Sequence, residues 1–516
     1  EMRFFVVLAA LTVAFVFPAN AAVDNTAANY AEHCAECHGA VRLGGMGPAL
    51  LPENLRRLHK SKAAGVIAAG RPATQMQGFA EYLSEAEIEA LVAFIYKPLP
   101  KLPEWGEAEI QKSRILHADT GALPQKPVHD ADPLNLFTVV ETGDHHATIL
   151  DGDRFEPLAR FPTHFAVHGG AKYTPDGRFV FLASRDGWIS KFDLYGLKLI
   201  AEVRAGINTR NVAVSADGKW LAVGNMLPHN IVILDAEDLW PKKIIPVVGD
   251  KQQTSRVSAV YTAPPRQSFI VALKDLPEIW EISYDPEAKV AKGLIHSYRE
   301  EEGYFDKSPF PVRRIRLDDY LDDFFFDQQY ANLIGAARNA RNGQVVNLNV
   351  GRKIADIALA AMPHLGSGIT WEYQGRTVLA TPHLKGGRVS VIDTRDWRTV
   401  REIKTLGPGF FMRSHEQTPY AWVDVFFGPN KDVIHVIDKR TLEIVKTLRP
   451  APGRTAAHVE FTRDGRFALV SIWEMDGALV VYDAATLEEV KRLPMKKPSG
   501  KYNVWNKTRY SAGTSH

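Results

Sequence analysis

The chain has 516 residues, 45% of them hydrophobic, which is enough for a large core and for more than one domain. Its 62 Lys and Arg residues nearly balance 60 Asp and Glu residues, and the formal net charge of +2 argues against a nucleic-acid partner.

Residues 1–21 have the pattern of a secretory signal peptide. Arg3 precedes an apolar run over residues 4–17, Pro18 ends this run, and residues 19–21, Ala-Asn-Ala, offer a cleavage site. The run is short for a membrane span, and no later stretch is long and apolar enough to be one. We therefore expect an exported protein whose mature chain has no membrane span.

The motif Cys34-Ala35-Glu36-Cys37-His38 is the attachment signature of a c-type haem. In this signature the thiols of Cys34 and Cys37 add to the two haem vinyl groups, and His38 ligates the iron from one side. A zinc site would need a second Cys or Cys/His pair, but the chain has no other cysteine. A thioredoxin-like dithiol would leave the adjacent histidine unexplained. The sequence therefore predicts a covalent haem c.

Residues 22–98 are predicted to form a small all-α domain around this motif. A short helix from Thr26 to His33 leads into it, and a second helix begins at Ser84 and ends before Pro98. The second helix has apolar residues at helical spacing, namely Ile88, Leu91, Val92 and Ile95.

This arrangement resembles a class I cytochrome c. The resemblance implies a second axial ligand, usually a methionine on the loop before the last helix. Met76 lies on that loop and is the preferred ligand, with Met46 and His59 as alternatives.

Residues 99–132 are rich in proline and polar side chains, and we interpret them as a linker. From residue 133 to 516 the pattern changes to short strands, and an apolar pair followed by an acid or amide recurs at intervals of 42 to 64 residues. The eight tags end at Asp151, Asp193, Asp235, Asp285, Asn349, Asp393, Asp438 and Asp483.

Asp-Gly turns precede three further strand-like runs, at residues 176–177, 217–218 and 464–465. A period of about 40–50 residues with several strands per unit indicates a β-propeller. The predicted fold is therefore a small all-α class I cytochrome c domain followed by an all-β eight-bladed propeller over residues 133–516. Residues 322–327, Asp-Asp-Phe-Phe-Phe-Asp, lie in the longest interval and are expected to form a packed loop.

Five histidines of the propeller lie in loop-like contexts, some of them glycine-rich: His168, His364, His383, His415 and His458. Any one of them alone would be expected to be structural. Five in one propeller indicate a site, because imidazole ligates iron and neutral histidine serves as an acid or base.

Together, the signal peptide, the haem motif and an eight-bladed propeller with these histidines resemble the haem d1 proteins of denitrifying bacteria. This family includes the cytochrome cd1 nitrite reductases and the dihydro-haem d1 dehydrogenases of haem d1 biosynthesis. The resemblance covers nearly the whole mature chain. Segments 184–188, 362–368, 409–416 and 502–506 look more like the dehydrogenase branch.

The resemblance implies a periplasmic oxidoreductase that converts a propionate side chain of dihydro-haem d1 to an acrylate and passes the electrons to haem c. Haem d1 or dihydro-haem d1 would bind non-covalently, as product or substrate. The implied partners are this tetrapyrrole, a periplasmic electron acceptor, and nitrite reductase as the recipient of haem d1. Two alternatives stay open: a cytochrome cd1-type nitrite reductase that forms NO, and a non-catalytic carrier of haem d1.

The resemblance also implies roles for individual residues. His168 matches the proximal iron ligand of the family, while His383 and His415 lie in segments that align best with the substrate-handling histidines of the nitrite reductases. His364 and His458 look like additions of the dehydrogenase branch. The candidate catalytic residues are His383, His415, His364 and Tyr173. The candidate tetrapyrrole contacts are His168 and His458, together with cations that would pair with its carboxylates, namely Arg185, Arg204, Arg210, Arg256 and Lys274.

Overall fold

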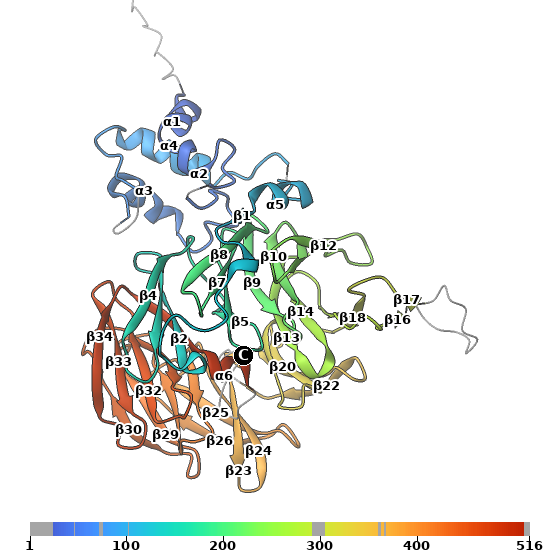
Figure 1. The fold of residues 1–516 in the computed structure, drawn as a ribbon, viewed down its shortest axis with the longest axis vertical. Helices are drawn as coiled ribbons and strands as arrows, with labels where there is room; N and C mark the ends of the chain where they lie inside the picture. Colours follow the sequence, from blue (N-terminus) through green and yellow to red (C-terminus); the bar gives the residue numbers. More distant parts are fainter. Residues whose placement is uncertain are drawn as a thin grey trace, which may run out of the picture.

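The computed structural model describes residues 24–45, 47–71, 76–101, 103–291, 305–359, 363–365 and 368–509. The predicted signal peptide and Met46 therefore lie outside the described residues. A small helical domain lies against one end of a large ring of β-sheets (Figure 1). No helix in the described ranges has the length and apolar character needed to cross a membrane.

The small domain contains four helices in its described part: α1 (Thr26–His33), α2 (Ala35–His38), α3 (Lys60–Ala69) and α4 (Glu85–Ile95). The predicted bounds of α1 are confirmed, and so is the start of α4 after Ser84. The Ser84 hydroxyl accepts from the Glu87 backbone N–H at 3.3 Å, and the Glu87 carboxylate accepts from the Ser84 N–H at 2.8 Å. This capping box satisfies backbone donors that a helix start otherwise leaves unpaired.

Arg42 closes the other end of α4, because its buried guanidinium donates to the carbonyls of Phe94, Ile95 and Lys97 at 2.8 to 3.0 Å. A cation at a helix C-terminus also interacts favourably with the helix dipole. The apolar face of α4 is buried in the core of the small domain.

The predicted linker follows the surface of the propeller. It contains α5 (Glu107–Ser113), β1 (Ile115–Leu116) and the 3₁₀ turns η1 (Thr120–Ala122) and η2 (Pro133–Asn135). Strand β1 pairs with an outer strand of one blade, and Ile110 is fully buried in the blade core. The isolated aromatic Trp105 donates its indole N–H to the Arg204 carbonyl at 2.8 Å.

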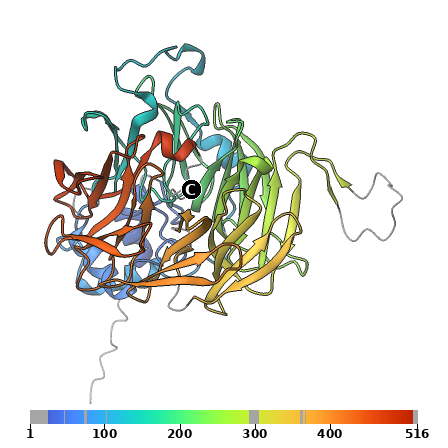
Figure 2. The same cartoon turned by 90° about the horizontal axis from the view of Figure 1, so that it is seen from below.

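Within the described residues, the predicted eight blades are confirmed as eight antiparallel sheets of four blade strands each. Seen from the end opposite the small domain, these sheets form a ring (Figure 2). From the innermost strand outward, the first four blades are β35 (Pro498–Asn503), β2 (Leu136–Glu141), β3 (His146–Asp151) and β4 (Pro157–Pro162); β5 (Lys172–Tyr173), β6 (Phe179–Ala183), β7 (Trp188–Asp193) and β8 (Lys198–Arg204); β9 (Asn208–Val214), β10 (Trp220–Leu227), β11 (Asn230–Asp235) and β12 (Pro241–Pro246); β13 (Val257–Ala263), β14 (Ser268–Leu273), β15 (Glu278–Ser283) and β18 (Val312–Arg316).

The last four blades are β19 (Leu321–Phe326), β20 (Asn332–Ala337), β21 (Asn342–Asn347) and β22 (Arg352–Ile357); β23 (Ile369–Tyr373), β24 (Arg376–Pro382), β25 (Arg388–Asp393) and β26 (Thr399–Lys404); β27 (Met412–Ser414), β28 (Tyr420–Asp424), β29 (Ile434–Asp438) and β30 (Ile444–Leu448); β31 (Ala456–Phe461), β32 (Phe467–Ile472), β33 (Gly477–Asp483) and β34 (Glu489–Met495). Outside the blades lie β16 (Val290–Ala291), β17 (Phe305–Asp306), the turn η3 (Pro264–Arg266) and the C-terminal helix α6 (Val504–Thr508). Strand β35 pairs with β2, so the two ends of the propeller sequence share one blade and close the ring.

In six blades the recurring tag ends the third strand, and in the fourth blade the tag Asp285 lies two residues after the strand end at Ser283. The side chain of the terminal acid accepts from backbone N–H groups two or three residues later, as Asp438 does from Arg440 at 2.7 Å. This local bond turns the chain toward the outer strand. In the fifth blade the turn residue is Asn347, two residues earlier than the predicted tag at Asn349.

Residues 322–327 are not the packed loop that we expected. Most of the segment forms β19, the inner strand of the fifth blade. Phe324 and Phe326 are buried against the fourth blade, and Phe325 is buried against the sixth. An inner strand between two blades is buried on both faces, so it can be apolar at consecutive positions.

Candidate functional site

The predicted haem c residues lie together on α1 and α2. Cys34 follows α1, and Cys37 and His38 end α2. The His38 Nδ1 lies 2.8 Å from the Pro48 carbonyl, so Nδ1 carries the proton and Nε2 keeps its lone pair for iron. A Cβ at Gly47 would lie only 2.8 Å from the imidazole, so glycine is required there. Burial lowers the pKa of His38, which keeps the ring neutral. These residues fit a covalent haem c.

The second axial ligand stays a prediction. Met76 is half-buried in the loop between α3 and α4, where its carbonyl accepts from the Arg71 N–H at 3.0 Å. His59 is exposed as the N-cap of α3, and Met46 lies outside the described residues.

His168 lies at the inner rim of the second blade, on the side of the small domain. Its Nδ1 lies 2.9 Å from the Arg210 carbonyl, so Nδ1–H donates and Nε2 is the acceptor, 3.0 Å from the Arg210 guanidinium. Burial lowers the pKa of His168 well below its usual value, and the nearby cations Arg210 and Arg185 lower it further. A neutral imidazole anchored through Nδ1–H is the form that ligates iron.

Three guanidinium groups gather around His168: Arg57 of the small domain, Arg185 of the second blade and Arg210 of β9. Burial lowers the pKa of Arg185 to about 9, with Arg57 and Arg210 as further causes. Its Nη2 is buried without a hydrogen-bond partner among the described residues. None of the three has an ion pair with a described Asp or Glu. This group of cations is suited to a ligand that has several carboxylates.

A row of aromatic and histidine rings lines the central channel of the propeller. His364 contacts Phe410 in a tilted arrangement with ring centroids 4.3 Å apart, Phe410 contacts Phe411, and Phe411 contacts His458 at 4.9 Å. His458 in turn contacts Tyr502 at 5.2 Å. The row continues toward His168. Gly170, two residues after His168, lies so close to Tyr502 that a Cβ there would be 2.9 Å from the Tyr502 ring. Flat apolar faces of this kind suit a planar macrocycle.

The two histidines of this row are held in opposite tautomers. The His364 Nδ1 lies 2.6 Å from the Phe410 carbonyl, so it carries the proton and leaves Nε2 as an acceptor. The His458 Nδ1 faces two donors, the backbone N–H and the side-chain amine of the fully buried Lys501, at 3.4 and 3.3 Å, and burial lowers the pKa of this amine well below its usual value. His458 therefore accepts at Nδ1 and presents Nε2–H. Burial lowers the pKa of both histidines, so both are neutral near pH 7.

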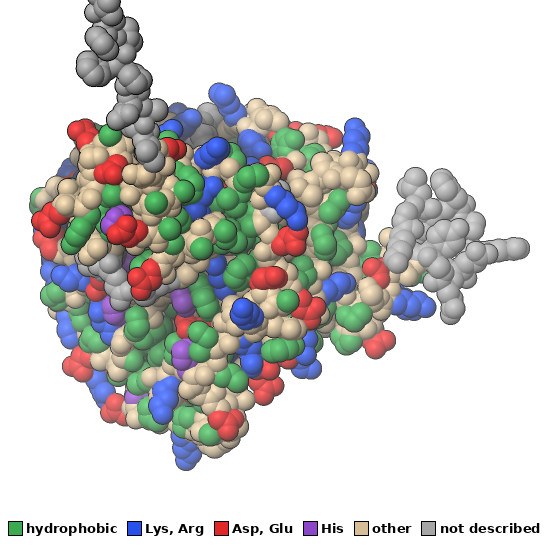
Figure 3. All heavy atoms as spheres, turned by 90° about the horizontal axis from the view of Figure 1, so that it is seen from above, with side chains coloured by type: hydrophobic (Ala, Val, Ile, Leu, Met, Phe, Trp, Pro, Cys, Tyr) green, Lys and Arg blue, Asp and Glu red, His purple; other side chains and the backbone are tan. Residues whose placement is uncertain are grey.

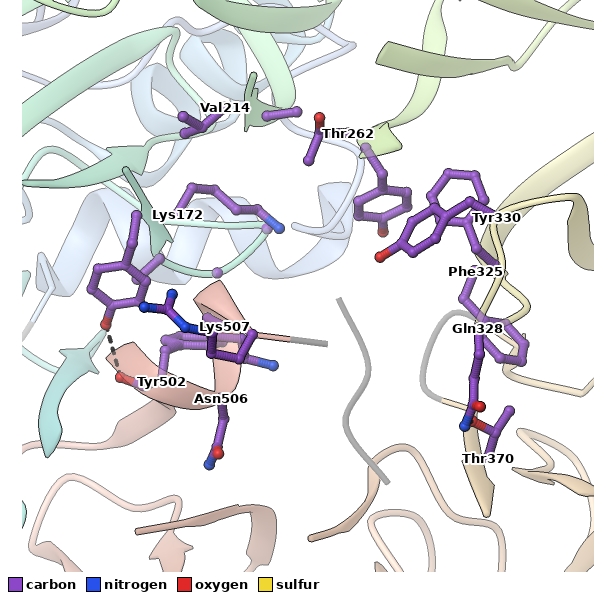
Figure 4. Close-up of a pocket in the computed structure, with 18 of the residues that line it drawn as sticks. Lys172, Val214, Thr262, Phe325, Gln328, Tyr330, Thr370, Tyr502, Asn506 and Lys507 are labelled. Carbon is purple, nitrogen blue, oxygen red and sulfur yellow. Dashed lines mark hydrogen bonds between the residues drawn. The ribbon is translucent and has the colours of Figure 1, made fainter. Parts of the chain in front are cut away.

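A cavity of about 560 Å³ lies along the channel (Figure 4). Lys172, Tyr502 and Lys507 project from one side of it, and Phe325 and Tyr330 from the other. Tyr502 belongs both to the cavity lining and to the ring row, whereas His168, His364 and His458 do not line this cavity. The described residues contain no group of three or more His, Cys, Asp or Glu side chains placed to hold a metal ion by themselves.

Of the other two predicted catalytic histidines, His383 lies beside the ring row, because its backbone pairs with Pro363 and its carbonyl accepts from the Gly409 N–H at 3.1 Å. His383 is fully buried after β24, and its Nε2 lies 2.8 Å from the Ser390 hydroxyl on β25, inside the sixth blade. His415 follows β27 at the opposite end of the strand from Phe411. Its Nε2 contacts the Arg463 carbonyl at 3.0 Å, and its Nδ1 accepts from the Gln417 N–H at 3.1 Å. Because backbone groups occupy both His415 nitrogens, its geometry is structural.

Tyr173 lines the cavity, but its hydroxyl lies 2.8 Å from both the Tyr502 carbonyl and the Thr138 hydroxyl. Burial raises its pKa, so the geometry does not support the predicted role as a base.

The predicted carboxylate-binding cations divide into two groups. Arg185 and Arg210 face His168. The others have protein partners: Lys274 pairs with Asp322, Arg256 pairs with Asp275, and Arg204 donates to the Leu43 and Asp186 carbonyls.

The residues of the site that were not predicted include Arg57, Asp424, Lys501 and Tyr502. Each joins the site through contacts between segments far apart in the chain. Tyr502 could have been found, because it lies in a segment that matches the dehydrogenase branch.

Seen from the side of the small domain, basic and acidic side chains are interspersed, so surface charge does not reveal the site (Figure 3).

Comparisons with known proteins identify the family of both domains. Residues 131–507 match the family model for the cytochrome D1 heme domain, and residues 21–95 match the model for cytochrome C oxidase, cbb3-type, subunit III. The chain is 57% identical over 487 residues to the dihydro-heme d1 dehydrogenase of Pseudomonas aeruginosa, covering 94% of this chain and 95% of that protein. It is 26% identical to the nitrite reductase of Stutzerimonas stutzeri, covering 92% and 91% of the two chains.

A solved structure described as dihydro-heme d1 dehydrogenase NirN in complex with DHE superimposes with a TM-score of 0.88. That chain is 56% identical, and the match covers 93% of this chain and 99% of the other. The chain therefore belongs to the cytochrome d1 heme-domain family, on the branch of the dihydro-heme d1 dehydrogenases.

Proposed function

We propose that this protein oxidises a propionate side chain of dihydro-haem d1 to an acrylate, giving haem d1. One observation carries the proposal: a neutral imidazole with an accepting Nε2, His168, stands beside Arg185, whose buried Nη2 has no hydrogen-bond partner among the described residues. An iron tetrapyrrole with carboxylate side chains satisfies both groups at once. The identity of 57% to a dihydro-heme d1 dehydrogenase, against 26% to a nitrite reductase, selects the reaction.

His168 and the cations bind and orient the substrate. His168 offers Nε2 to the substrate iron, and Arg185 and Arg210 pair with carboxylates of the ring. Arg210 now contacts the His168 imidazole at 3.0 Å, so its guanidinium turns to a carboxylate when His168 ligates iron. The row of rings from His364 to Tyr502 packs against the macrocycle and excludes water.

His364 and His458, the two distal histidines, have different roles because they are held in opposite tautomers: one accepts a proton and the other donates a hydrogen bond. His364 is the base, because its Nε2 lone pair has no donor among the described residues and can accept a proton while the Phe410 carbonyl holds Nδ1–H. Once protonated, the His364 imidazolium is stabilised by that carbonyl. His458 presents Nε2–H and donates a hydrogen bond to the substrate carboxylate, because Lys501 fills its Nδ1 lone pair.

The conversion of propionate to acrylate removes two protons and two electrons. His364 takes one proton at Nε2, and the second leaves to solvent. Bound to Cys34, Cys37 and His38, haem c supplies a one-electron acceptor next to the propeller. An external acceptor in the periplasm would take up these electrons, and nitrite reductase is the proposed recipient of haem d1. Export through the N-terminal signal would bring the chain to the compartment of both partners.

The test uses purified, haem c-loaded protein without any other electron acceptor. Dihydro-haem d1 added to the oxidised protein under anaerobic conditions should yield one haem d1 for every two haem c groups reduced, since each haem c takes one electron. Absorption spectra report both changes in one sample. Tight binding with no conversion would support a carrier instead, and rapid nitrite turnover by the haem d1-loaded protein would support a nitrite reductase.

A further inference from the structure

A loop of the small domain, residues 51–58, lies on the propeller beside the proposed substrate site. The Asn54 amide donates to the Ile207 carbonyl at 3.1 Å, and the Asn208 amide donates to the Glu53 carbonyl at 3.1 Å. Leu51 is 2% exposed and packs on Ile207 in a shared apolar cluster. The two domains are therefore joined by apolar contacts and by hydrogen bonds in both directions.

This contact is one or two residues from the cations around His168. The Thr209 N–H donates to the Arg185 carbonyl at 3.0 Å, and Arg210 follows directly. The loop that meets Ile207 and Asn208 thus brings Arg57 to the same place. Burial is the largest cause that lowers the pKa of Arg185, and the charge of Arg57 is the next. For Arg57, burial is again the largest cause that lowers the pKa, and the charge of Arg210 is the next.

The arrangement costs free energy in the protein alone. Three guanidinium groups repel one another, and no described carboxylate pairs with any of them. The Arg57 side chain makes no hydrogen bond or ion pair with the described residues, so protein structure gives no reason for its position. Its neighbour Arg56 is also exposed, but it is not among the charges that act on His168 or Arg185.

We propose that Arg57, supplied by the haem c domain, completes the binding site for the substrate carboxylates, so that both domains hold the tetrapyrrole together. This inference rests on the proposed function and extends it, because it makes the haem c domain part of the substrate site as well as the outlet for electrons. The ligand class is a planar iron tetrapyrrole with several ionised carboxylates.

The test measures binding rather than turnover. In full-length, haem c-loaded protein, dithionite keeps haem c reduced, so that no electrons can be accepted and dihydro-haem d1 can be titrated at equilibrium by absorption. Arg57→Gln should raise Kd roughly tenfold or more, because a charge-assisted hydrogen bond is lost. Arg57→Lys should recover part of the affinity, and the control Arg56→Gln should leave Kd unchanged.

A second arm separates a carboxylate contact from a loosened domain contact. With the methyl ester of the same tetrapyrrole, wild type and Arg57→Gln should bind equally, whereas a loosened interface would weaken binding of the ester as well. Equal affinity of Arg57→Gln and wild type for the free acid would overturn the inference while the proposed function stands. If wild type fails to bind dihydro-haem d1 at all, the proposed function fails too.

Discussion

Asp424, the last residue of β28, ties the two distal histidines together. It is 1% exposed, and its carboxylate accepts from the Phe410 N–H at 2.7 Å, the Phe411 N–H at 3.2 Å and the His458 N–H at 3.4 Å. The Phe410 carbonyl in turn holds His364. Burial outweighs these bonds and raises the pKa of Asp424 to about 7, so this one group makes the stability of the site depend on pH.

The sign follows from proton binding in the two states. The unfolded chain ionises Asp424 near its ordinary value of 3.8 and the native protein near 7, so between these values the native state holds more protons. The free energy of unfolding therefore falls as pH rises from about 4 to about 7, by about 4 kcal/mol in total. Between pH 5 and pH 8 the loss is about 3 kcal/mol. Asp424→Asn keeps one carbonyl oxygen for Phe410 and Phe411 but cannot ionise, so it should lack this loss.

Denaturant unfolding followed by circular dichroism, at several values between pH 5 and pH 8, measures the slope. Relative to wild type, Asp424→Asn should gain stability steadily as pH rises. Asp432 is the matched control, because it is also buried and its pKa is lowered by the Gly453 N–H. Asp432→Asn should remove a contribution that is lost only as pH falls below about 4, and should leave the slope above pH 5 unchanged. If Asp424→Asn has the wild-type slope over this interval, the reasoning is wrong.

Two further predictions concern the assigned histidines. His168→Gly should abolish the absorption change on binding dihydro-haem d1 and leave the haem c spectrum intact, and added imidazole should restore the change, because a free ring can replace the missing ligand. His364→Gln should lower the rate of haem c reduction by the substrate by about 10²- to 10⁴-fold with Kd nearly unchanged, the range for loss of a general base. His415→Gln is its control, and a loss of rate as large as that of His364→Gln would contradict the assignment of His415 as structural.

The fold was predictable because each blade repeats a local signal. In most blades an acid at the end of the third strand bonds to N–H groups two or three residues later, so residues close together in the sequence determine the turn and its spacing. The same is true of the Asp-Gly turns, where Gly177, Gly218 and Gly465 have φ of 72° to 78°. The same reasoning did not identify the strand at residues 322–327, because a strand that is buried on both faces shows no alternation of apolar and polar residues.

The site was only partly predictable. A histidine in a loop-like segment has the same local appearance at either end of a blade strand, so sequence context could not separate His364 from His415. The difference lies in their partners: Phe410, which turns one ring into the channel, and Arg463 of the next blade, which holds the other ring away from it. Arg57 could not be predicted for a stronger reason, because it reaches the site only when one domain docks on another.

The proposed chemistry gives a reason for this sharing of the site. Each substrate loses two electrons, but the chain has cysteines for one haem c, which accepts one electron at a time. The substrate must therefore stay bound while haem c is emptied between the two transfers. A site held by His168 alone would release the ring easily, whereas charge contacts from both domains slow its dissociation. Because Arg57 belongs to the domain that receives the electrons, the contact that retains the substrate also keeps that domain seated beside it. It follows that weakening this contact should lower the yield of product per substrate bound more than it lowers the rate of the first electron transfer.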